Sequence, residues 1–238
     1  MRTVQLFLDE PHQKYTNKYG DILPSVTSII GKHIAIPQLV PWAFGLGKRG
    51  KCLEKDGGKK RRIGSIFHFG AHGFLDGFKC DFSLCAKDEV ECAEEMIEGF
   101  KKWWWKSGLD RIHCELQLAS DKHGFGGTVD LIARDKQGRL VLVDFKTSSS
   151  LKPQYELQMA GYKMLYEDCH PFDEDIEAVK LLRIGYDNDI EERNFEDLTP
   201  QMEAWKAILR FHSAYKQIED RTKGQKTWPR KRKSKASS

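Results

Sequence analysis

Residues 126–147, with the sequence GGTVDLIARDKQGRLVLVDFKT, predict a β-hairpin that decides the fold. Two runs of aliphatic residues flank a three-residue KQG loop, whose glycine suits the left-handed conformation that such a loop requires. This loop pairs Asp135 with Arg139, and the same register places Asp130 directly opposite Asp144. Directly opposed residues have Cβ atoms roughly 4.5–5.5 Å apart. The hairpin therefore predicts two carboxylates that can share one metal ion.

Strand alternation assigns the side chains of this hairpin to two faces. Asp130, Asp144 and Lys146 are expected on one face. The other face is expected to be core and to hold Val129, Leu131, Val141, Val143 and Phe145. Two opposed acids on an apolar sheet repel each other and are poorly hydrated, which is costly unless a cation neutralises them. The alternative is that both acids lie at fraying, solvated strand ends.

The rest of the chain predicts an α/β fold. Apolar residues recur at helical spacing through most of the first half, and the second half alternates strands with helices. Helices are expected at residues 25–31, with Ser25 as N-cap and Gly31 at the end, and at 37–46, 62–75, 89–105, 153–167 and from 199. Strands are expected at residues 112–119, 126–134, 139–147 and 178–186. The basic stretch 48–62 contains Gly57-Gly58 and is expected to be a mobile loop.

Charge is distributed unevenly along the 238 residues. Residues 1–62 carry a net charge of +7 and residues 221–238 carry +8, whereas the stretch between them carries −11. Basic ends suit a polyanion and an acidic centre suits cations, as in a metal-dependent enzyme that acts on nucleic acid. The pattern is equally typical of a solvated surface with a disordered tail.

Length and patterning predict one domain over residues 1–222, made of a basic N-terminal lobe (1–62) and a core (63–222), followed by a disordered basic tail (223–238). No apolar run is long enough to span a bilayer, and the first residues lack the features of a secretory signal, so the protein is expected in the cytoplasm without a membrane partner. Cys80, Cys85 and Cys92 could be three zinc ligands, but their spacing matches no common zinc motif and favours ordinary packing.

The hairpin resembles a known family. Asp130, followed after the turn by Asp144-Phe145-Lys146, resembles the motif of PD-(D/E)XK nucleases. The sequence QMAGY (158–162) matches the Q-x-x-x-Y element of the RecB-like and phage-type exonuclease branch, and is similar to that of the mitochondrial genome maintenance exonuclease. The resemblance implies a restriction-endonuclease-like core, in which helices flank a central mixed β-sheet, with a mainly helical N-terminal half.

The same resemblance implies a site and its cofactor. GSIFH (64–68) resembles the element whose histidine completes the metal shell in the RecB-like branch. The implied metal ligands are His68, Asp130, Asp144 and the Phe145 backbone carbonyl, and the implied ion is Mg²⁺ or Mn²⁺. Glu115, in the strand before the hairpin, is expected either to bind a second metal or to orient a neighbour. A lone helical histidine is otherwise more often a core or surface residue. His72 follows His68 by one turn, where its spacing lets it face the same ion. An iron–sulfur cluster is not expected, because only Cys169 follows the Q-x-x-x-Y element.

The function that follows is a metal-dependent DNA nuclease of the phage-recombination type, an exonuclease on single-stranded or duplex DNA ends in replication, recombination or repair. In this hypothesis Lys146 orients or deprotonates the attacking water, while Gln158 and Tyr162 line the active site and contact the DNA strand or support the lysine. A recombination or single-strand-binding protein is a further expected partner. The tail residues Arg230, Lys231, Arg232 and Lys233 are expected to bind DNA, or to be an import-like address or an idle tail. The alternatives are a structure-specific endonuclease or resolvase on the same fold, and a nucleic-acid-binding factor that does not cleave.

Overall fold

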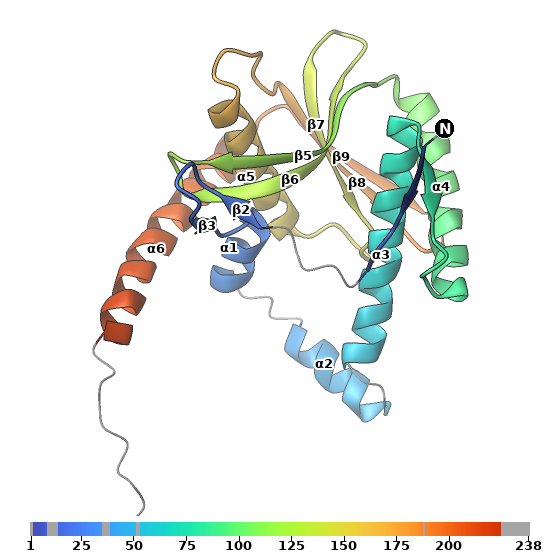
Figure 1. The fold of residues 1–238 in the computed structure, drawn as a ribbon, viewed down its shortest axis with the longest axis horizontal. Helices are drawn as coiled ribbons and strands as arrows, with labels where there is room; N and C mark the ends of the chain where they lie inside the picture. The colour runs from blue at the N-terminus through green and yellow to red at the C-terminus, as the bar shows by residue number, and fades with distance from the viewer. Residues whose placement is uncertain (1, 9–13, 35–38, 51–52, 188, 225–238) are drawn as a thin grey trace, which may run out of the picture.

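The computed structural model describes residues 2–8, 14–34, 39–50, 53–187 and 189–224. Its centre is a five-stranded mixed sheet with the order β5-β6-β7-β8-β9 (Figure 1). The strands are β5 (Asp110–Ser120), β6 (Phe125–Arg134), β7 (Leu140–Lys146), β8 (Ala178–Ile184) and β9 (Ile190–Phe195). β7 and β8 are parallel, and the other neighbours are antiparallel.

Helices cover both faces of this sheet. α3 and α4 lie side by side on one face, and α5 with α1 and α6 covers the other (Figure 1). The helices are α1 (Val26–His33), α2 (Leu39–Lys48), α3 (Leu53–Asp76), α4 (Lys87–Ser107), α5 (Pro153–Cys169) and α6 (Thr199–Gly224). Two small sheets pair β1 (Thr3–Gln5) with β4 (Lys79–Asp81) and β2 (Tyr15–Thr16) with β3 (Ile22–Leu23). The predicted α/β class and the mainly helical N-terminal half are confirmed. None of the described helices is long and apolar enough to cross a membrane.

The predicted hairpin is present with the predicted loop. The Asp135 N–H donates to the Arg139 carbonyl at 3.0 Å, and Gly138 has φ +84°. The β6–β7 ladder pairs Leu131 with Val143, so that Asp130 and Asp144 occupy the next rung beyond the last paired one. The hairpin register is therefore the predicted one, because a short loop with one glycine leaves little freedom in the pairing of its strands.

The assignment of side chains to faces was wrong for Val129. Both faces of β7 are covered, and Leu142 packs under α5 on the face where Asp144 lies. Val129, expected beside Leu131, instead packs with its partner Leu116 on the α5 side, whereas the Cys114–Leu131 rung packs on the α3 side. Strict alternation would put these two rungs on one face. The switch falls between them on β5, at Glu115, whose φ of +48° breaks the regular pleat.

The basic stretch 48–62 is not a loop before the helix, because α3 already begins at Leu53. Two glycines inside a helix cost about 1 kcal/mol each. The helix is held further along by Ile63, Ile66 and Phe67, which are at most 4% exposed, and each buried side chain of this size contributes about 1.5–3 kcal/mol. Burial therefore outweighs the glycine penalty.

The remaining differences lie at element ends. α1 is capped by Ser25, whose Oγ accepts from the Ser28 N–H at 3.0 Å, but it continues past Gly31 to His33. α6 continues to Gly224, two residues beyond the expected domain boundary. Residues 225–238, which include the basic tail, lie outside the described residues.

Candidate active site

Asp144 lies near the end of β7 and is only 1% exposed, so it is not a solvated acid at a fraying strand end. Its carboxylate forms an ion pair with Lys146 and accepts a hydrogen bond from Gln158 Nε2 at 3.3 Å. Gln158 Nε2 also donates to the Tyr162 hydroxyl at 2.8 Å. Burial raises the pKa of Asp144 to about 6, against the opposing effect of the Lys146 charge. The side chains of β7 and α5 thus form one connected polar network inside an apolar layer.

Asp130 links this network to α3. Its Oδ2 accepts a hydrogen bond from the Phe145 N–H at 2.7 Å, and its Oδ1 lies 3.4 Å from His68 Nδ1. Burial alone lowers the pKa of His68, but the Asp130 carboxylate outweighs it and raises that pKa to about 9. Without a metal, the raised pKa favours the protonated form of His68 beside Asp130 at neutral pH.

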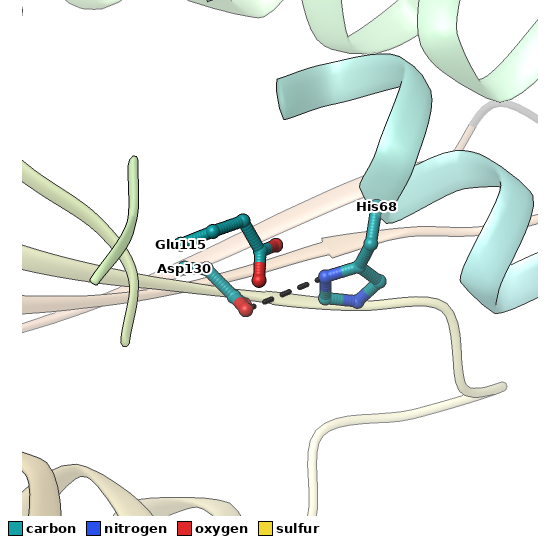
Figure 2. A group of neighbouring side chains, drawn as sticks. All are labelled: His68, Glu115 and Asp130. Carbon is teal, nitrogen blue, oxygen red and sulfur yellow. Dashed lines mark ion pairs between the residues drawn. The ribbon is translucent and has the colours of Figure 1, made fainter. Parts of the chain in front are cut away.

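Glu115 completes a group with these two residues. Figure 2 shows His68, Glu115 and Asp130 converging from α3, β5 and β6, and one ligand atom from each lies within 4.8 Å of the others. We call these three residues the candidate ligand group. Burial, and then the charge of Asp130, raise the pKa of Glu115 to about 7. Glu115 is the one non-glycine residue with positive φ in the described chain, a strained conformation that is frequent at functional sites.

Two glycines permit the close approaches that shape the site. A Cβ at Gly64 would lie 2.9 Å from Thr147 Oγ1, so the absence of a side chain lets α3 approach the end of β7 and bring His68 to Asp130. A Cβ at Gly127 would lie 2.7 Å from the Tyr162 ring, so this glycine makes room for the ring under β6. These contacts give a physical reason for glycine in the GSIFH element and before Asp130.

Tyr155 on α5 and His72 on α3 differ in their relation to the site. Tyr155 packs against the core, and Lys146 Nζ lies 5.0 Å from its ring centroid. The signal in the sequence was its place three residues before Gln158, on the same helix face. His72 Nε2 lies 3.0 Å from Asp76 Oδ2, and its ring meets Phe78 edge-on, so His72 does not join the candidate ligand group. Spacing alone had allowed both histidines to face one ion.

A family model described as the PD-(D/E)XK nuclease superfamily matches residues 43–227. The chain belongs to the PD-(D/E)XK nuclease superfamily. The match encloses every residue of the site described above, and the mixed sheet with helices on both faces is the restriction-endonuclease-like core that the resemblance implied. Nucleases of this superfamily use divalent metal ions. The candidate ligand group fits one, because two carboxylates and an imidazole, which are groups that divalent ions bind in proteins, offer ligand atoms within 4.8 Å of one another.

Solved structures similar to this PD-(D/E)XK chain have low sequence identity. A candidate exonuclease from Eubacterium rectale is 12% identical, with a TM-score of 0.43, over 68% of this chain and 70% of its own. An alkaline exonuclease from Laribacter hongkongensis is 14% identical, with a TM-score of 0.33, over 54% of this chain and 72% of its own. The protein SSO0001 is 16% identical, with a TM-score of 0.31, over 53% of this chain, and the match spans 62% of that protein's length. No curated protein matches in sequence.

Proposed function

We propose that this chain is a Mg²⁺- or Mn²⁺-dependent deoxyribonuclease that acts as an exonuclease on DNA ends. The observation that carries the proposal is the connection between the candidate ligand group and the Asp144–Lys146 ion pair. The Phe145 N–H donates a hydrogen bond to Asp130, and Phe145 lies between Asp144 and Lys146 in the chain. A binding factor that does not cleave has no use for an ammonium group held beside two buried acids.

The residues divide into ligands and supporting groups. His68, Glu115 and Asp130 would hold the ion, with Asp144 and the Phe145 carbonyl as further ligands. Carboxylate oxygens suit Mg²⁺ and Mn²⁺, and the imidazole tilts the preference towards Mn²⁺. A bound divalent ion supplies Lewis acidity and positive charge next to the scissile phosphate.

Lys146 would handle the attacking water. Its ammonium lies between the Asp144 carboxylate and the Tyr155 ring, which restrict its side-chain freedom. From there it can orient the water and stabilise the charge that develops on the phosphate. Gln158 holds the Asp144 carboxylate, and Tyr162 holds Gln158, so these two residues position the acid and the lysine.

The preference for ends rests on the resemblance of Gln158 and Tyr162 to the exonuclease branch, and the rival is an endonuclease on the same fold. The test is incubation with end-labelled linear DNA and with covalently closed circular DNA, single-stranded and duplex, in Mg²⁺, Mn²⁺ or EDTA. We expect loss of linear DNA only, and only with metal. Cleavage of circles would make the protein an endonuclease, and absence of any cleavage would favour the binding factor.

The basic tail is proposed as a non-specific DNA contact. Arg230, Lys231, Arg232 and Lys233 would neutralise phosphates without reading bases, so truncation after Trp228 should lower the slope of log affinity against log salt by roughly two to four units. An unchanged slope would leave the tail without a role in DNA binding.

A further inference from the structure

The basic stretch before the candidate active site is part of the same helix as His68. Arg61 lies seven residues before His68 on α3, which is two helical turns, so both residues lie on one face of the helix. At 1.5 Å per residue their α carbons are about 10 Å apart along the axis. The helix thus fixes the spacing between the backbone of Arg61 and that of His68.

The two neighbours of Arg61 with described ion pairs are tied to α4. Lys59 Nζ lies 2.5 Å from Asp88 Oδ2, and Arg62 binds the buried Glu89 carboxylate through two of its nitrogens. These pairs fix the helix to its neighbour. They leave the charges of Lys59 and Arg62 already compensated by acids.

Arg61 differs from both. Its side chain is exposed, and no acid within the described parts of the chain forms an ion pair with it. The sequence gives the reason, because the positions three and four residues away hold Gly57, Gly58, Gly64 and Ser65, none of which can neutralise a guanidinium.

The exposed side of α3 between Arg61 and His68 carries a small residue, Ser65. Ser65 folds its hydroxyl back onto the Arg61 carbonyl at 3.2 Å, whereas Gly64 is buried and faces Thr147. At the far end of this face the His68 side chain is 30% exposed, whereas Asp130 is 12% exposed. A polyanionic strand that follows this side of α3 passes Ser65 and reaches the candidate ligand group from the His68 side.

We propose that Arg61 binds a backbone phosphate of the DNA strand whose scissile phosphate lies at the candidate ligand group. This inference rests on the proposed nuclease function and adds a second fixed point for the strand. One strand of a duplex rises 3.4 Å per nucleotide, so about 10 Å corresponds to about three nucleotides. The planar guanidinium binds phosphate oxygens in a bidentate fork, which fixes the register of the strand as well as its affinity.

The first test measures DNA binding in EDTA, so that nothing is cut, over a range of salt concentrations. Arg61→Gln should lower the slope of log affinity against log salt by about 0.9 on duplex DNA or about 0.7 on single strands, the loss of one phosphate contact. Lys59→Gln is the matched control, because it removes one charge on the same helix that Asp88 already neutralises, and its slope should equal that of the wild type. Equal slopes for all three proteins would overturn the proposal, and so would an equal loss in both variants.

The second test locates the contact. Single phosphates of the DNA are replaced in turn by neutral methylphosphonates, and affinity is measured for wild type and Arg61→Gln. Wild type should lose affinity at one position about three nucleotides from the bond that is cut, and Arg61→Gln should lose none there. Identical profiles would overturn the proposal. Arg61→Lys should restore the salt slope, because it keeps the charge.

The outcomes separate this inference from the proposed function. If the wild type cuts DNA but has the same salt slope as Arg61→Gln, only the Arg61 contact is refuted. If the wild type cuts nothing but its salt slope is steeper than that of Arg61→Gln, the nuclease function is refuted and the Arg61 contact is supported.

Discussion

Replacing Glu115 by glutamine should stabilise the metal-free protein, although it removes a charged group from the candidate active site. Glutamine keeps the size and backbone preference of glutamate but carries no charge beside Asp130. The pKa of Glu115 is raised to about 7 by burial and by the Asp130 charge. A raised carboxyl pKa means that the folded state binds the proton more tightly than the unfolded state. The destabilisation caused by Glu115 therefore grows as pH rises from about 4.5 to about 7 and is constant above that range.

The size of the effect follows from the pKa values. The shift from 4.5 to about 7 corresponds to about 3 kcal/mol at 1.36 kcal/mol per pKa unit. The side chain is half-buried, and solvent screening lowers this to about 1–2 kcal/mol. In a domain of 150–250 residues, 1 kcal/mol shifts the Tm by about 2–4 °C. We expect Glu115→Gln to raise the Tm by about 2–8 °C at pH 8.

The assay is thermal unfolding in EDTA at a series of pH values. The Tm gain should shrink steadily between pH 7 and pH 4.5, and Glu94→Gln on the exposed side of α4 should show no such trend. With added Mn²⁺ the wild type should have the higher Tm of the two proteins. Metal binding stabilises the folded wild type, and the variant, which lacks one carboxylate ligand, gains less. A lower Tm for Glu115→Gln at pH 8, or a gain that is the same at every pH, would refute the reasoning.

Three further changes test the rest of the site. Asp144→Asn should abolish cleavage of linear DNA in Mg²⁺ while the far-UV circular dichroism spectrum is kept, and activity near that of the wild type would remove Asp144 from the proposed ligands. Tyr155→Phe should keep most of the turnover. Tyr155→Leu, which has no ring over Lys146, should lower kcat about tenfold. Equal rates for the two variants would make Tyr155 a packing residue only. Gly64→Ala should lower kcat and the Mn²⁺ affinity measured by titration, because the added Cβ would lie 2.9 Å from Thr147 Oγ1 and displace α3. An unchanged Mn²⁺ affinity would mean that α3 accommodates the methyl group without loss.

The parts of the fold that sequence predicted are those set by local chemistry. The hairpin register follows from a short loop with Gly138, and the shared face of Gln158 and Tyr162 follows from helical spacing. Strand β9 was not predicted, because its sequence IEERNF has no apolar periodicity. It is held instead by pairing with β8 and by the Lys180–Glu192 ion pair, which no short window of sequence contains.

The parts of the site that sequence could not predict depend on contacts between distant elements. The start of α3 looked like a loop because of Gly57-Gly58, but ion pairs of Lys59 and Arg62 to α4 and a buried stripe further along stabilise the helix in this region. The face switch at Glu115 is a single backbone dihedral, which alternating residue types do not encode. His72 pairs with Asp76 on its own helix, at 3.0 Å, and so does not join the candidate ligand group.

The origin of the candidate ligand group in three separate elements has a consequence for biosynthesis. His68, Glu115 and Asp130 come from α3, β5 and β6, so no fragment of the growing chain that lacks the docked hairpin can gather them. Under the proposed function, metal affinity would appear only once the hairpin has docked against α3, so a nascent or partly unfolded chain would carry no nuclease activity near the nucleic acid around it. Bound metal would then indicate that this part of the fold has assembled correctly.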